Sequence, residues 1–129
     1  MKKLHIIYGL VVAVAFLLTG QYMRHHDPVM SDLTDAVRLL YRSVHIYILA
    51  AALVNLGVGS YYQTRSGRWQ RIVQTVGSLF IIVPPAFLLL AFFTEPFLAR
   101  LQRPYSRPAV IMLAIGTMLH LISGIRADA

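Results

Sequence analysis

Residues 72–94 read IVQTVGSLFIIVPPAFLLLAFFT and contain no charged side chain. A helix needs roughly 20 apolar residues to cross the hydrocarbon core of a bilayer, so this stretch is long enough to cross. Pro84 and Pro85 stand near its centre, where they remove two backbone donors and disfavour a straight helix. We therefore expect a crossing helix that is kinked at Pro84-Pro85. The alternative is a re-entrant hairpin with its apex at the prolines.

Three further stretches have the same apolar character, namely residues 4–23, 44–62 and 109–125. The chain is 57% apolar and 13% charged and contains no Cys, which argues against a soluble domain, a disulfide-stapled domain and a disordered chain. The stretches are continuously apolar and do not alternate in polarity, so they predict helices rather than barrel strands. The sequence thus predicts an all-α fold with a single domain, residues 1–129, forming an integral membrane bundle of four transmembrane helices. Three spans plus the hairpin remain the alternative.

The polar residues 24–43 separate the first two spans. Ser31 is a good N-cap, and Asp32 and Asp35 would complement the positive end of a helix that starts there. We expect this helix to be an amphipathic lead-in at the membrane interface that continues into the second span. Lys2 and Lys3 could instead open a signal peptide. The small residues of a cleavage site are missing after Leu18, so an uncleaved anchor is favoured.

The formal charge of +7 is typical of membrane proteins with basic loops, and it favours anionic lipid over nucleic acid as a partner. Over four crossings the Lys and Arg residues divide evenly, with Lys2, Lys3, Arg65, Arg68, Arg71 and Arg126 on one side and Arg24, Arg38, Arg42, Arg100, Arg103 and Arg107 on the other. The basic residues before the first span favour a cytoplasmic N-terminus in a bacterial-type inner membrane. The hairpin would instead give a clear charge bias, and dual topology with an antiparallel dimer is a third alternative. Small four-helix multidrug transporters are similar in size and charge balance, but they carry a Glu in the first span, which this chain lacks.

The polar residues inside the spans predict contacts between helices. His120 shares a helical stripe with small residues in the fourth span, and Asn55 lies at a comparable depth in the second, so a hydrogen bond between them is expected. Gln74 and Ser78 stand near the start of the third span and His5 near the start of the first. Packing of the bundle is the main interpretation, and no cofactor is expected. The alternative is a b-type haem held by His5 and His120, although their depths differ by roughly 6 Å at 1.5 Å per residue.

Residues 120–126, with the sequence HLISGIR, are similar to the His-x-x-x-Gly-Ile-Arg segment of succinate dehydrogenase membrane-anchor cytochrome b subunits. In that family a His of this segment lies near the haem, so the resemblance implies a haem near His120. It covers seven of the 129 residues. A further His commonly follows the Arg in the family, whereas Ala127 follows Arg126 here. We interpret the similarity as one of composition.

Two further groups of residues could bind ligands outside the spans. His25, His26 and His45, with Asp27 and Glu95, could gather as a divalent metal site, although their spacing matches no known closed site. The arginines at 65, 68 and 71 and at 100, 103 and 107 are expected to contact anionic lipid headgroups.

No spacing typical of a phosphate loop, a zinc protease or a hydrolase nucleophile occurs in the chain. No charged residue lies deep in a predicted span, which disfavours a pump or an ion-coupled transporter. We therefore expect a non-enzymatic accessory or scaffolding subunit of a membrane complex, bound to other membrane subunits or forming a homodimer. The alternatives are a haem-binding redox subunit that uses His120 and a small dimeric transporter.

Overall fold

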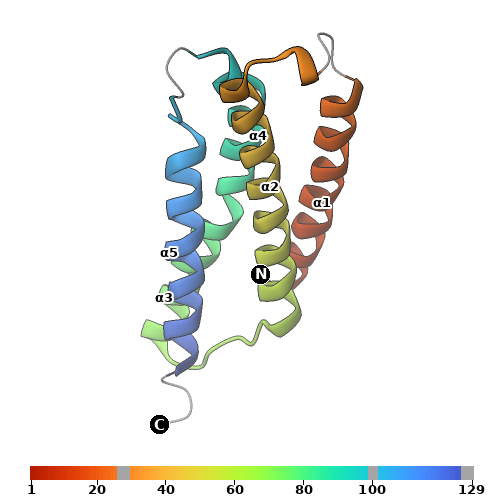
Figure 1. Cartoon of the computed structure of the whole chain (residues 1–129). Coiled ribbons are helices and arrows are strands. Elements are labelled where there is room, and N and C mark those ends of the chain that lie inside the picture. Colours follow the sequence, from red (N-terminus) through yellow and green to blue (C-terminus); the bar gives the residue numbers. More distant parts are fainter. Residues whose placement is uncertain (26–29, 99–101, 126–129) are drawn as a thin grey trace.

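The computed structural model describes residues 1–25, 30–98 and 102–125, and this part of the chain is helical and contains no strand. Figure 1 shows the helices side by side in one bundle. The helices are α1 (Lys2–His25), α2 (Asp35–Tyr61), α3 (Arg68–Ile82), α4 (Pro84–Thr94) and α5 (Ser106–Ile125), with short 3-10 turns η1 (Met30–Asp32) and η2 (Glu95–Phe97). The all-α expectation is confirmed.

Four helical segments are long and apolar enough to cross a membrane: α1, α2, α5 and the segment Arg68–Phe97, which joins α3, α4 and η2. Large apolar side chains are exposed on all of them, including Leu17 (63% exposed), Leu53 (58%) and Met118 (62%). A soluble monomer rarely exposes such extensive apolar surface, whereas lipid tails solvate it readily.

The third span continues through the prolines with a kink of 18°. The Val83 amide still bonds to the Leu79 carbonyl at 3.0 Å, and the Ala86 amide bonds to the Val83 carbonyl at 3.1 Å. Pro84 and Pro85 occupy the first positions of α4, where their fixed φ is compatible with a helix. The kinked span is therefore correct and the re-entrant hairpin is wrong.

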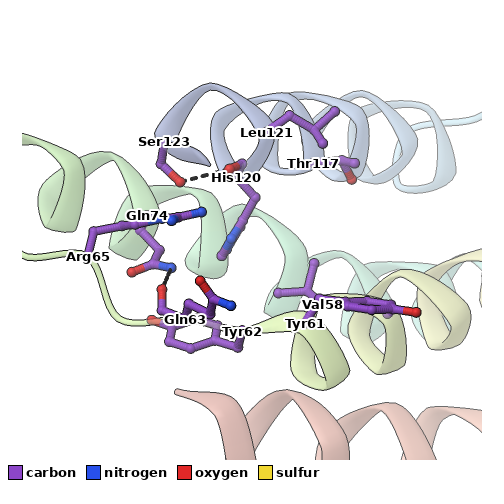
Figure 2. Close-up of a pocket in the computed structure, with 11 residues that line it drawn as sticks. Val58, Tyr61, Tyr62, Gln63, Arg65, Gln74, Thr117, His120, Leu121 and Ser123 are labelled. Carbon is purple, nitrogen blue, oxygen red and sulfur yellow. Dashed lines mark hydrogen bonds between the residues drawn. The ribbon is translucent and has the colours of Figure 1, made fainter. Parts of the chain in front are cut away.

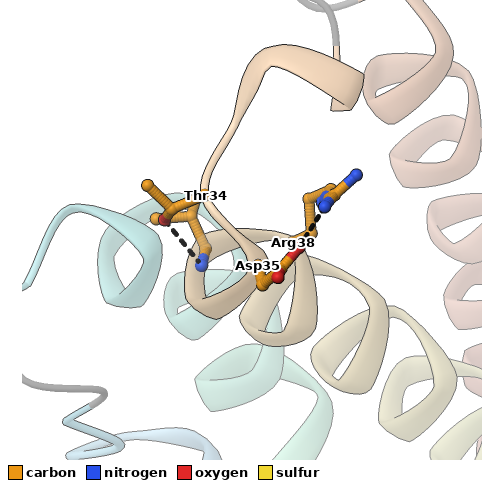
Figure 3. A network of polar contacts seen from close by, with 4 residues as sticks. Thr34, Asp35 and Arg38 are labelled. Atoms are coloured by element: carbon orange, nitrogen blue, oxygen red, sulfur yellow. Dashed lines mark hydrogen bonds and ion pairs between the residues drawn. The ribbon is translucent and has the colours of Figure 1, made fainter.

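The second span begins at a different cap from the one expected. Ser31 lies in η1 and its hydroxyl bonds to its neighbour Asp32, so the prediction that Ser31 is the N-cap is wrong. Thr34 has the extended backbone of an N-cap, and its hydroxyl accepts a hydrogen bond from the Val37 amide (Figure 3). Asp35 pairs with Arg38 in the first turn. From there α2 runs without a break to Tyr61, so the expected lead-in and the second span form one helix.

Glycines allow the closest helix contacts. α1 packs mainly on α2, and α3 packs mainly on α5. A Cβ on Gly59 would lie 2.7 Å from an Ile6 side-chain carbon, and a Cβ on Gly116 would lie 2.8 Å from the carbonyl oxygen of Gly77. A larger residue at either position would push the helices apart. These close approaches bring the polar side chains of the four spans within bonding distance.

We predict that the two ends of the third span face opposite sides of the membrane, because they lie at opposite ends of the bundle (Figure 1). The exposed residues Ser66 and Gln102 can each be changed to Cys in a chain that has no native Cys. A membrane-impermeant maleimide should label Ser66→Cys and Gln102→Cys from different sides in sealed vesicles. Labelling of both from the same side would contradict the kinked crossing.

Candidate functional site

Four polar side chains, one from each span, meet in the interior of the bundle. His5 Nδ1 lies 3.0 Å from Asn55 Oδ1, and His5 Nε2 lies 3.0 Å from the Ser78 hydroxyl. The same hydroxyl lies 2.9 Å from His120 Nε2. His5, Asn55 and Ser78 have no exposed surface. We call these four residues the interior network.

The hydrogen bonds of Asn55 fix the direction of the network. Its Nδ2 donates to the Ala51 carbonyl at 2.9 Å and to the Ile81 carbonyl at 3.3 Å, so its Oδ1 is left to accept from His5 Nδ1. With a neutral ring, His5 Nε2 then accepts from the Ser78 hydroxyl. The Ser78 oxygen in turn accepts from His120 Nε2. The three hydrogen bonds of the network are therefore complementary in donor and acceptor while both imidazoles are uncharged.

The carbonyl of Ile81 explains why Asn55 is needed. In an α-helix this carbonyl would accept from the amide four residues later, which belongs to Pro85 and has no hydrogen. Asn55 of α2 supplies the missing donor. Freed carbonyls in membrane helices must be satisfied by neighbouring groups, and here one amide both satisfies the kink and joins α2 to His5.

The expected direct bond between Asn55 and His120 does not form, because His5 and Ser78 lie between them. The ring centroids of His5 and His120 are 5.9 Å apart, a separation that is compatible with the expected difference in depth. α5 continues past the interior network for more than a turn, whereas α1 begins only a few residues before it.

The two histidines do not fit a bis-imidazole haem in this arrangement. Their Nε2 atoms are both bonded to the hydroxyl of Ser78, at 3.0 and 2.9 Å. A haem iron takes axial ligands on opposite faces of a flat macrocycle, which would have to replace Ser78 and separate α1 from α5. His5 is fully buried and has both ring nitrogens in hydrogen bonds.

A cavity of about 260 Å³ adjoins the interior network at the end of the bundle where α2 joins α3 (Figure 2). Its polar lining comprises Tyr62, Gln63, Arg65, Gln74, Thr117, His120 and Ser123. Gln74 Nε2 donates to the Gln63 carbonyl at 2.8 Å, which ties α3 to the connection that precedes it. Burial raises the pKa of the Tyr62 hydroxyl, so it remains protonated at neutral pH.

The histidines considered as metal ligands are not brought together in the described residues. His25 is exposed at the end of α1, and His26 lies outside the described residues. His45 bonds through Nδ1 to the Thr19 hydroxyl at 2.9 Å and stacks on Phe16. Within residues 1–25, 30–98 and 102–125, no group of three His, Cys, Asp or Glu side chains is placed to hold a metal ion.

Glu95 has a structural role that its sequence position did not reveal. It is fully buried, and one carboxylate oxygen accepts from the Tyr105 amide at 2.9 Å and from the Ser106 amide at 2.7 Å. The other accepts from the Ser106 hydroxyl at 2.7 Å. The carboxylate therefore caps the positive end of α5 from the end of the third span. In the capping box that a sequence can reveal, the two partners are three residues apart. Glu95 and Ser106 are eleven residues apart, so their pairing has no recognisable sequence motif.

Comparisons with protein-family profiles, curated proteins and solved structures find no match for the chain.

We predict that Asn55→Leu, which nearly conserves volume, lowers the free energy of unfolding by about 1–3 kcal/mol, because it removes the donor to Ile81 and the acceptor for His5. Pro85→Ala restores a backbone donor for the Ile81 carbonyl. In that background Asn55→Leu should cost about 1 kcal/mol less. Reversible unfolding in detergent micelles measures both effects, with Ser60→Ala, at an exposed hydroxyl of α2, as the control. Equal costs in the two backgrounds would contradict the link between Asn55 and the kink.

We predict that Glu95→Ala lowers the free energy of unfolding by about 2–3 kcal/mol, because it strands the donors at the start of α5. Glu95→Gln keeps an acceptor oxygen but loses the charge, so about half of this loss is expected. The neighbouring Thr94→Ala, which removes a hydroxyl bonded only to its own helix, is the control. The same unfolding assay applies. Effects of Glu95→Ala no larger than those of Thr94→Ala would show that the cap contributes little.

Proposed function

We propose that this chain is a non-enzymatic accessory subunit of a membrane complex. The observation that carries the proposal is the interior network, in which the polar side chains of the four spans bond to one another. Catalysis or coupled transport generally requires ionisable groups that face a substrate or an ion path. Here Asn55, His5 and Ser78 are engaged with each other, and the buried Glu95 caps a helix. Such an arrangement supports a rigid bundle more than a reactive site.

We further propose a bacterial-type inner membrane location with the N-terminus in the cytoplasm. Lys2 and Lys3 lie at the start of α1. At the same end of the bundle, Arg65 lies in the α2–α3 connection, and Arg68 and Arg71 lie at the start of α3. The described acidic residues, Asp32, Asp35 and Glu95, lie toward the other end. Basic residues next to the first span usually face the cytoplasm, which supports this orientation. In the labelling experiment above, Ser66→Cys should then react from the cytoplasmic side.

The proposal can be tested on the full chain produced from its own chromosomal locus with a small affinity tag. After extraction in a mild detergent, the 14.5 kDa chain should sediment in one larger assembly with partner subunits in fixed stoichiometry. Deleting the gene that encodes this chain should reduce the amount of that assembly.

Three results would overturn the proposal. The chain could sediment as an isolated monomer or homodimer and leave other membrane assemblies unchanged when deleted. Reconstituted protein could drive substrate-dependent flux in liposomes, which would identify a small transporter. Purified protein could show a Soret band that is lost in His120→Ala. That result would identify a haem-binding redox subunit and contradict the conclusion that the two histidines do not fit a haem.

A further inference from the structure

The cavity beside the interior network has one end lined by polar side chains and another by apolar ones. Figure 2 shows Tyr62, Arg65 and His120 converging on it from the α2–α3 connection and α5. Its remaining lining includes Gly57, Val58 and Tyr61 of α2 and Leu121 of α5. Tyr61 and Leu121 are 88% and 59% exposed on the outside of the bundle. The cavity therefore leads from polar groups within the protein to the surface that lipid would contact.

Arg65 supplies the charge at the polar end. Its side chain is half-buried, and its Nε is buried without a hydrogen-bond partner among the described residues. Its Nη2 passes so close to α5 that a Cβ on Gly124 would lie 3.0 Å from it. A buried donor without a partner is rare and costly in a folded protein. A guanidinium held in this way is suited to bind an anionic oxygen group through two parallel hydrogen bonds.

The surroundings of Arg65 favour a negatively charged ligand. The described charged residues at this end of the bundle are Lys2, Lys3, Arg68 and Arg71, which are all basic. The described carboxylates lie toward the opposite end. At a membrane surface, a cluster of this kind attracts anionic headgroups.

The apolar end has room for a hydrocarbon chain. A Cβ added at Gly57 would meet no atom within 4 Å, unlike the glycines at which helices touch. α2 and α5 contact each other far less than α1 contacts α2, and residues of both helices line the cavity.

We propose that this cavity binds the phosphate headgroup of an anionic phospholipid. The Arg65 guanidinium holds the phosphate, and the Tyr62 side chain lies at the same end of the cavity. One acyl chain runs past Gly57 and Leu121 to the lipid surface. This lipid site is additional to the proposed accessory role and does not depend on it.

The test uses the purified full chain in neutral detergent micelles and follows the melting temperature as lipid is added. Phosphatidylglycerol should raise the melting temperature more than zwitterionic phosphatidylcholine does, in the unchanged protein and in the control Arg42→Gln, an exposed arginine near the other end of α2. In Arg65→Gln, half-saturation should need about tenfold more phosphatidylglycerol, because a charge-assisted pair is lost. Equal responses to the two lipids, or an unchanged response in Arg65→Gln, would overturn the proposal.

Two further measurements distinguish lipid binding from the binding of free phosphate and from a folding defect. Gly57→Leu projects into open space, so it should fold normally, fill the path of the acyl chain and abolish the response to phosphatidylglycerol. Gly57→Ala is the matched control and should retain it. A full response in Gly57→Leu would overturn the acyl-chain placement. Inorganic phosphate that reproduces the whole Arg65-dependent shift would overturn the assignment to a lipid.

Discussion

The structure depends on the carbonyl of Ile81, which loses its usual donor because the residue four positions later is Pro85. Inside a membrane no water is available to replace that donor, so another helix must provide it. Asn55 of α2 does so, and its side chain is thereby held with the amide oxygen directed at His5. The kink of the third span and the position of the interior network thus have one cause.

That orientation propagates across the bundle. Because Asn55 accepts from His5, the ring of His5 presents an acceptor to Ser78, and Ser78 presents an acceptor to His120. Each bond joins a different pair of spans, so the network holds α1, α2, α3 and α5 together without a charged side chain. In the absence of a hydrophobic force between helices in lipid, such bonds and the close packing at glycines supply the specificity of assembly.

The two ends of the bundle are stabilised differently. At one end Glu95 joins the third span to α5 by capping the first amides of α5. At the other end the cavity separates α2 from α5, and Gln74 ties α3 to the connection before it. The end with the carboxylate is closed by internal bonds, whereas the end with Arg65 contains a buried donor that the described residues leave unpaired.

The sequence by itself determined the helical class, the four apolar stretches and the break in backbone bonding at Pro84-Pro85, because hydrophobic length and loss of a backbone donor are local properties. The choice between a kinked span and a re-entrant hairpin was decided by the structure. The sequence also indicated Asn55, Ser78 and His120 as interior polar residues. Only the tertiary structure decided their partners, since a small error in helix tilt or offset changes which atoms lie within 3 Å. The partnership of Glu95 with Ser106 and the orphaned Nε of Arg65 were likewise decided by the fold. Both depend on how residues distant in sequence approach one another, which helical periodicity does not encode.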